Sequence, residues 1–218
     1  MGMLVPISYD GSLQRKLAAG DILCNFEPVP PATDATGTLS YTAAMLLAPV
    51  YVRNPAAVST DTFPSADALV SSLNAGLGTS PGVPANLAFR WKVINLSINL
   101  LTGAVVANSG ATMVRGNVAA SSTKDFLVTI TNGTPLQTVT NLTTVNASAV
   151  VTGFTAAQIA ALSVGQIVTN AVANLQGQTI IAVNATALSV TMSGAANASA
   201  STNTITFSPT YTITGLAA

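Results

Sequence analysis

The most constraining feature of this sequence is a long C-terminal stretch without charge. Asp125 is the last of seven acidic and seven basic residues in 218, so residues 126–218 have no ionisable side chain with a formal charge. A soluble domain usually has about 25% charged residues, and here the value is 6%. Such a chain either buries much of its surface in an assembly or is coated with Ser, Thr and Asn. We expect assembly to be the main reason.

The composition also excludes several classes of enzyme. The chain has no histidine and a single cysteine, Cys24, so it cannot form a Ser-His-Asp or Cys-His centre, a His/Cys zinc site or an internal disulfide. No two of its carboxylates have the close spacing of a paired acid/base site, and no Gly-Lys-Ser/Thr phosphate loop is present. We therefore predict a protein that is not an enzyme and has no cofactor, catalytic residue or metal site.

Charge and hydropathy also bear on partners and location. The formal net charge is zero, which gives no electrostatic attraction to nucleic acid or to an anionic membrane. The first six residues have neither a basic segment nor a long apolar run, which predicts no secretory signal. No window of about 20 residues is uninterruptedly apolar. The sequence thus predicts neither nucleic acid nor membrane as a partner.

Residues 1–45 have the composition of an extended arm. Pro28, Pro30 and Pro31 exclude regular helix and central strand there. Such an arm can add to the sheet edge of a neighbouring molecule. Cys24 is expected to be a small buried hydrophobe. The arm residues predicted to contact assembly partners are the apolar ones: Leu4, Leu13, Leu17, Ile22 and Phe26.

Residues 46–135 have the pattern of a compact β domain with one short helix. Ser65 is placed to cap a helix over Ala66–Asn74, which Gly76 would end. In the strand that follows, Phe89, Trp91 and Val93 alternate with Arg90 and Lys92, so one face is expected in the core and the other in solvent. Phe89 and Trp91 are also included among the predicted assembly residues. Further strands are predicted at 103–107, 112–118 and 125–131.

Residues 136–218 have the pattern of a second β domain, rich in Thr and Asn. Thr155 and Gln158 have the spacing of a capping box at the start of a short helix. The remaining segments are rich in β-branched residues, which favours strands; these are predicted at 149–152, 166–169, 178–183, 188–192, 204–207 and 211–214. The predicted fold class is all-β, with two sandwich-like or jelly-roll-like domains, an extended Pro-rich N-terminal arm and one or two short helices.

Part of this pattern resembles a module of tailed-bacteriophage virion proteins. The resemblance begins with Ser59–Pro64 and the helix Ala66–Asn74. It continues in the aromatic strand Phe89–Ser97, and it ends in the strand Lys124–Ile130. In the C-terminal half, residues 165–168, 178–183 and 188–193 also resemble a Gly/Thr-rich phage structural module, so that the resemblance covers about two thirds of the chain. Asn108-Ser109-Gly110 stands where the module usually has Gly-Thr-Gly.

The resemblance implies a structural protein of the head decoration (cement) or head-fibre type. Such proteins are typically homotrimers without catalytic activity. We therefore predict a trimer, assembled in the host cytoplasm, that binds the major capsid protein or neighbouring virion proteins on the outer head surface and stabilises the shell. Two alternatives remain open: a tail, baseplate or fibre component that acts as an adaptor or binds a receptor, and a bacterial surface-layer or adhesin domain.

Overall fold

The computed structural model describes residues 22–23, 33–34, 37–48, 50–78, 82–170 and 172–216. Strands are the main regular secondary structure of these residues, with three helices and several sheets, which confirms the all-β class. The described residues include three helices, whereas one or two were predicted. The predictions for Leu4, Leu13, Leu17, Cys24, Phe26 and the three prolines lie outside the described residues.

The first sheet has seven strands and is mixed. It has the order β2-β3-β5-β8-β15-β7, with β1 beside β5. The pair β5–β8 and the pair β8–β15 are antiparallel, whereas β1–β5, β2–β3, β3–β5 and β7–β15 are parallel. The strands are β1 (Ile22–Leu23), β2 (Thr33–Asp34), β3 (Val50–Arg53), β5 (Ala88–Asn95), β7 (Ala111–Val114), β8 (Ser122–Asn132) and β15 (Thr210–Gly215).

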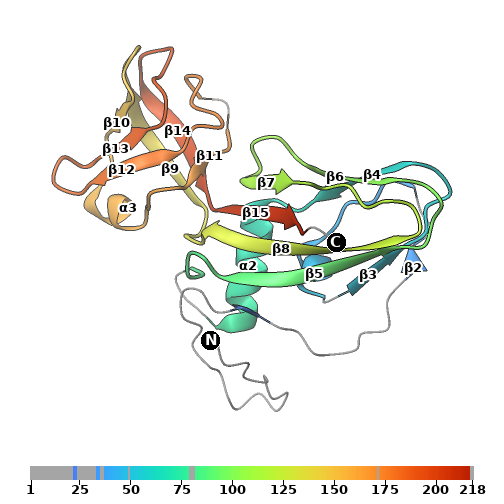
Figure 1. The fold of residues 1–218 in the computed structure, drawn as a ribbon. Helices are drawn as coiled ribbons and strands as arrows, with labels where there is room; N and C mark the ends of the chain where they lie inside the picture. Colours follow the sequence, from blue (N-terminus) through green and yellow to red (C-terminus); the bar gives the residue numbers. More distant parts are fainter. Residues whose placement is uncertain are drawn as a thin grey trace.

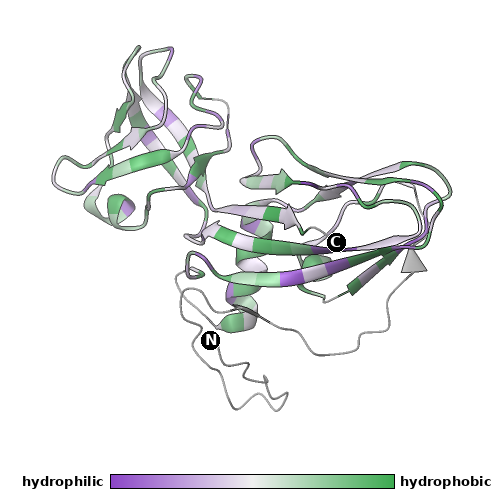
Figure 2. Ribbon diagram, viewed as in Figure 1, coloured by the Kyte–Doolittle hydropathy of each residue, from purple (hydrophilic) through white to green (hydrophobic). Residues whose placement is uncertain are grey.

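The centre of this sheet follows the predicted alternation. Trp91 of β5 lies opposite Phe126 of β8, and both are buried, whereas Arg90 is exposed. Figure 2 shows β5 with purple bands in its middle and green on either side of them. The indole N–H of Trp91 donates to the carbonyl oxygen of Met45 at 3.1 Å, so the one polar atom of this ring is satisfied.

Two helices and a two-stranded parallel sheet contribute the other side of the first core. They are α1 (Ala43–Leu47), α2 (Ala66–Leu77), β4 (Ser59–Phe63) and β6 (Leu101–Val105). Ser65 caps α2 as predicted, its hydroxyl accepting from the N–H of Ala68. The helix is longer than predicted, because Gly76 is accommodated within it. It ends instead at Gly78, whose φ of 61° is the left-handed conformation of a helix terminus.

The second sheet has six strands in the order β11-β14-β9-β10-β13-β12, and all its pairs are antiparallel. It encloses a separate cluster of buried residues together with α3 (Ala156–Ala160), which begins with the predicted capping box of Thr155 and Gln158. The strands are β9 (Gln137–Thr144), β10 (Val150–Thr152), β11 (Ile167–Val168), β12 (Ile180–Asn184), β13 (Ser189–Met192) and β14 (Ala200–Ser208).

The last strand does not stay with the second sheet. β15 returns to the first sheet, where it lies between β8 and β7 and buries Tyr211 and Ile213. Residues 136–218 were predicted to form one β domain, but they do not all belong to one sheet. The second sheet is instead an insertion between two neighbouring strands of the first, and the chain crosses between the two sheets twice (Figure 1).

Hydrogen bonds join the two sheets at this crossing. The side-chain amide of Asn132, at the end of β8, donates to Ser163 Oγ at 2.7 Å and to the carbonyl oxygen of Val164 at 2.8 Å. From β15, the hydroxyl of Thr210 donates to the carbonyl oxygen of Gly165 at 3.2 Å. Because Asn132 is 4% exposed, these bonds are partly shielded from water and fix how the inserted sheet meets the first.

Candidate functional site

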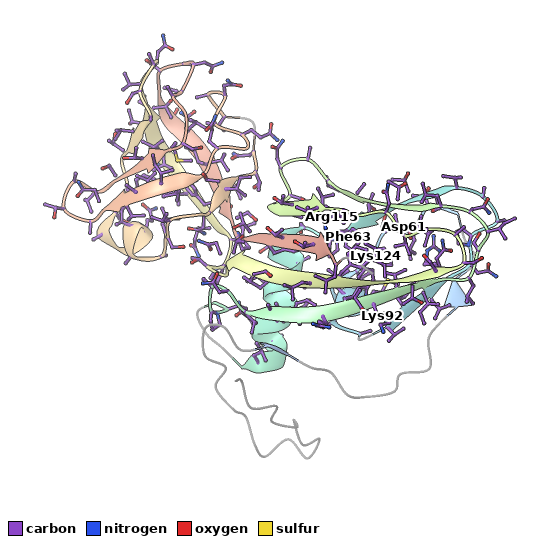
Figure 3. All side chains as sticks on the ribbon, in the orientation of Figure 1. Asp61, Phe63, Lys92, Arg115 and Lys124 are labelled. Carbon is purple, nitrogen blue, oxygen red and sulfur yellow. The ribbon has the colours of Figure 1, made fainter. Side chains whose placement is uncertain are left out.

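A buried ion pair between β3 and β4 is the main polar feature of the first core. Arg53 Nε donates to Asp61 Oδ2 at 2.8 Å, and a terminal nitrogen of Arg53 donates to Oδ1 at 2.9 Å. The Arg53 and Asp61 side chains are 0% and 3% exposed. Two parallel bonds of this kind form the strong bidentate geometry of a guanidinium with a carboxylate. Figure 3 labels Asp61 on β4.

Ser59 of β4 also donates to Asp61 Oδ1 at 2.9 Å, and the other partners of Asp61 come from the segment that leads into α1. The hydroxyl of Tyr41 donates to Oδ2 at 2.9 Å, and the N–H of Leu39 donates to Oδ1 at 3.1 Å. Arg53 also donates to the carbonyl oxygen of Gly37. The ion pair therefore holds residues 37–41 against β3 and β4, and we assign it a structural role. The last residues of the predicted arm thus belong to the folded part of the chain, with Tyr41 in the first core.

Two buried tyrosines make the first core sensitive to alkali. Burial raises the pKa of Tyr41 and of Tyr211 well above the usual value of 10. For Tyr41, the negative charge of Asp61 and the hydrogen bond to Asp61 raise the pKa further. The folded chain therefore keeps both phenolic protons at pH values at which the unfolded chain loses them. Their contribution to stability is complete below pH 10 and decreases as the pH rises further.

We expect the first core to unfold progressively more easily above about pH 10. Each of the two tyrosines lowers the free energy of unfolding by about 1.4 kcal/mol per pH unit there. Trp91 is the only tryptophan and is buried in this core, so urea titrations followed by its fluorescence at pH 9 to 11.5 measure the effect. Tyr211→Phe should halve the slope. A stability that does not change across this range would contradict the assignment.

A small cavity lies within the same core, between Asp61, Phe63, Trp91, Leu101 and Phe126. The cavity volume is about 10 Å³, about the room that one water molecule needs. A metabolite or cofactor does not fit in this space. The aromatic rings around the cavity pack against one another, and the ring centroids of Phe63 and Trp91 are 5.5 Å apart.

The loop after β5 presents apolar side chains to solvent. The alternation of β5 continues past its end, so that Asn95 and Ser97 point inward while Leu96 and Ile98 point outward. The exposed fractions are 54% for Leu96, 86% for Ile98 and 39% for Leu100, and neighbouring Val58 is 68% exposed. We call these four residues the apolar ridge. Together they expose on the order of 400 Å² of apolar surface, the size at which a patch marks an interaction site.

Polar side chains beneath the apolar ridge fix its shape. Asn95 Nδ2 donates to the carbonyl oxygen of Asn99 at 2.8 Å and to that of Ala119 at 2.9 Å. The hydroxyl of Ser97 donates to the carbonyl oxygen of Pro55 at 2.6 Å, which ties the loop to the residues before Val58. Asn95 and Ser97 are both buried. The polar groups are thus satisfied inside, and the apolar groups are held outside.

The apolar ridge lies at the end of the first sheet farthest from the second. Asn95 pairs with Ser122, the first residue of β8, whereas the second sheet follows the last residue of β8, Asn132. Eleven residues of extended chain span about 35 Å. Figure 1 shows the loop between β5 and β6 on the side of the first sheet opposite the β9–β14 strands.

The surface of the second sheet is uncharged and rich in Thr and Asn, with exposed apolar side chains among them such as Val145, Val164 and Ile181. Thr138, Thr140 and Asn141 of β9 are exposed, as are Thr202 and Thr204 of β14. Hydroxyl groups also bond across strands, as between Thr138 and Thr206 at 3.1 Å. All described charged side chains lie between Arg53 and Asp125. This part of the chain therefore presents a surface rich in Thr and Asn to water. Such a surface is the second of the two explanations that the low charge content allowed.

The structure changes the reading of the predicted assembly residues. Phe89 and Trp91 are 4% and 0% exposed, so they stabilise the first core and do not face a partner. Their alternation with Arg90 and Lys92 had already indicated a buried face. Ile22 lies in β1, where it pairs with Ala88 of the same chain. Leu4, Leu13, Leu17 and Phe26 lie outside the described residues.

Sequence reasoning missed both the ion pair and the apolar ridge. The spacing of the carboxylates from one another gives no indication that Asp61 pairs with Arg53, eight residues earlier. For the apolar ridge a signal did exist: the odd-numbered residues from Phe89 onward point inward, and extending this parity places Asn95 and Ser97 inside and Leu96 and Ile98 outside. The parity was not continued beyond the strand.

Within the described segments, no three His, Cys, Asp or Glu side chains gather as a metal site would need. No described helix has the length and hydropathy of a membrane span. No family model, curated protein or solved structure matches the chain.

Proposed function

We propose that this chain is a non-enzymatic virion structural protein, a head decoration protein that binds the outer surface of a tailed-phage head and stabilises it. The observation that carries the proposal is the division of the molecule into two unlike ends. One end presents the apolar ridge, where four large apolar side chains lie together, and the other is a charge-free sheet rich in exposed Thr and Asn, with single exposed apolar residues among them. An apolar end favours contact with protein, and an uncharged polar end favours exposure to water.

Adhesion is the mechanism that these features support. Contacts repeated at many positions of a shell add up, so that each needs only modest strength. Apolar surface buried between subunits raises the cost of separating them. The chain would thereby resist rupture of the shell by the pressure of the packaged DNA.

We propose further that the two sheets, each with its own core, are two β domains. The first comprises β1, β2 and residues 37–135 together with β15, and the second comprises residues 136–208. In this arrangement the second domain is inserted into the first through two neighbouring strands. The sandwich or jelly-roll description suits the antiparallel second sheet better than the mixed first sheet.

Removal of the chain from particles tests the proposed function. Particles assembled without it should rupture at a lower temperature than complete particles, as measured by the release of DNA on heating. Addition of the purified chain to the deficient particles should restore the original rupture temperature. Equal rupture temperatures with and without the chain would contradict a stabilising role on the head.

A further inference from the structure

We propose that Asn132 is a deamidation site whose reaction is held back by the hydrogen bonds that join the two sheets. Asn132 is the only asparagine of the chain that is followed by glycine. In such a pair the backbone nitrogen of the glycine reaches the side-chain carbon of the asparagine easily, because glycine has no Cβ to obstruct the approach. The inference concerns the crossing between β8 and β9, and it does not depend on the proposed function.

The reaction needs water as its only co-reactant. The backbone nitrogen of Gly133 attacks Cγ of Asn132, and a C–N bond forms. The proton of the attacking nitrogen passes through solvent to the side-chain nitrogen, which leaves as ammonia. Water then opens the resulting succinimide ring at either carbonyl, which gives aspartate or isoaspartate. Both products place a carboxylate in residues 126–218, where no side chain is otherwise charged.

Three hydrogen bonds restrain the side chain of Asn132 against this reaction. Nδ2 donates to Ser163 Oγ at 2.7 Å and to the carbonyl oxygen of Val164 at 2.8 Å, and Oδ1 accepts from the N–H of Thr134 at 2.8 Å. The nitrogen that must leave is thus held by two acceptors. Asn132 is also only 4% exposed, so water has little access to it. The side chain therefore reacts mainly when these bonds open.

The backbone of Gly133 is restrained as well. Its carbonyl oxygen accepts from the N–H of Val83 at 3.0 Å, and a Cβ at this position would collide with the carbonyl oxygen of Val83. Glycine is therefore required at position 133. An amide side chain is required at position 132, because its partners include both acceptors and a donor. The packing at this crossing thus requires the pair of residues that is most prone to deamidation.

Deamidation weakens the connection between the two sheets. A carboxylate at position 132 cannot donate to the carbonyl oxygen of Val164, so two oxygen atoms then face each other without a proton between them. Isoaspartate also lengthens the backbone at the point where Asn132 pairs with Thr210 of β15. Because the ammonia is lost, the change is permanent. The second sheet therefore becomes more loosely attached as the protein ages.

The rate of deamidation in the full-length chain tests the inference. Mass spectrometry of peptic peptides that contain Asn132 measures the exchange of NH₂ for OH after incubation at mildly alkaline pH, and the acidic digestion stops the reaction. The folded chain should react at least about tenfold more slowly than the chain unfolded in urea. Ser163→Ala removes one acceptor and should speed the reaction of the folded chain about fivefold, with no change in urea.

Ser193→Ala is the matched control for this experiment. Its hydroxyl bonds to Gln178 within the second sheet, so its loss should change neither rate. Three results would overturn the inference: equal rates in the folded and the unfolded chain, no deamidation of Asn132 in urea, or an unchanged rate in folded Ser163→Ala.

Asn132→Asp tests the consequence of the reaction directly. Backbone hydrogen exchange in residues 163–166 should be about fivefold faster in this variant than in the unaltered chain. Asn146→Asp, at an exposed asparagine, is the matched control and should exchange at the unaltered rate. Trp91 fluorescence should remain that of a buried indole in both variants, which shows that the first core is folded. Unaltered exchange in Asn132→Asp would contradict the loosening of the second sheet.

Discussion

Asp61→Asn should destabilise the first core by about 3–5 kcal/mol, the cost of leaving a buried charge without its partner. The substitution keeps the shape of the side chain but removes the charge that balances Arg53, which is 0% exposed. Leu39 and Tyr41 both donate hydrogen bonds to Asp61. The NH₂ group of an asparagine at this position cannot accept such a bond, so at least one of these donors would lose its partner. Urea unfolding followed by Trp91 fluorescence measures the loss.

Asp125→Asn is the matched control for this prediction. Asp125 forms an ion pair with Lys92 at 3.6 Å, but the two side chains are 41% and 42% exposed. Exposed pairs of this kind contribute about 0–1 kcal/mol, so the same chemical change should have little effect there. Similar losses at the two sites, or a loss below about 1 kcal/mol for Asp61→Asn, would contradict the structural role of the buried pair.

Asp61→Asn should also loosen the segment at residues 37–41. This segment is attached through bonds from Leu39 and Tyr41 to Asp61 and from Arg53 to Gly37. Local opening exposes backbone to proteases before the whole chain unfolds. Limited proteolysis should therefore cut Asp61→Asn near residues 37–41 under conditions in which Asp125→Asn stays intact.

Truncation after Ser208 should unfold the first core, even though it leaves every strand of the second sheet in place. The truncation removes β15, an internal strand of the first sheet that lies between β8 and β7. It also removes Tyr211 and Ile213, both fully buried. The loss of two such side chains alone costs about 5 kcal/mol or more, and the loss of the pairing of β8 and β7 adds to it. Trp91 fluorescence should shift to that of a solvent-exposed indole.

The complementary deletion should leave the first core folded. Asn132 and Thr210 are paired residues of β8 and β15, so residues 134–209 can be replaced by one glycine. The resulting Gly133-Gly turn joins the two strands as a two-residue hairpin, for which glycine is well suited. This variant should keep buried Trp91 fluorescence and unfold cooperatively. Loss of the first core in this variant, or its survival in the truncated chain, would contradict the inserted arrangement of the second sheet.

Local sequence signals predicted local structure well. Ser65, Thr155 and Gln158 marked the starts of helices because a capping side chain acts within three residues. The alternation through Phe89, Trp91 and Phe126 marked strands with one buried face. By contrast, β4 and β9 were missed, since STDTF and QTVTNLTT contain mostly polar residues. The place of β15 was missed because pairing between distant strands leaves no signal within either strand.

The candidate surface was predictable only in part. The shortage of charge correctly indicated an unusual surface, but composition does not say where apolar residues gather. Continuing the alternation of β5 places Ile98 outward, but the bond from Ser97 to Pro55, 42 residues earlier, leaves no signal in the sequence. Phe89 and Trp91 were assigned to assembly, although their alternation with Arg90 and Lys92 indicated a buried face; large aromatic residues suit both interfaces and cores. In this fold the same property places them in the core.

The most direct test of the account is the location of the chain on the particle. Electron microscopy of phage particles from the lysate in which the chain is made, labelled with an antibody to the second sheet, would show it. The account predicts label spread over the whole head, since the Thr/Asn-covered end faces outward. Label confined to the tail, or no label on particles, would contradict a head decoration protein and would favour a tail component or a protein outside the virion.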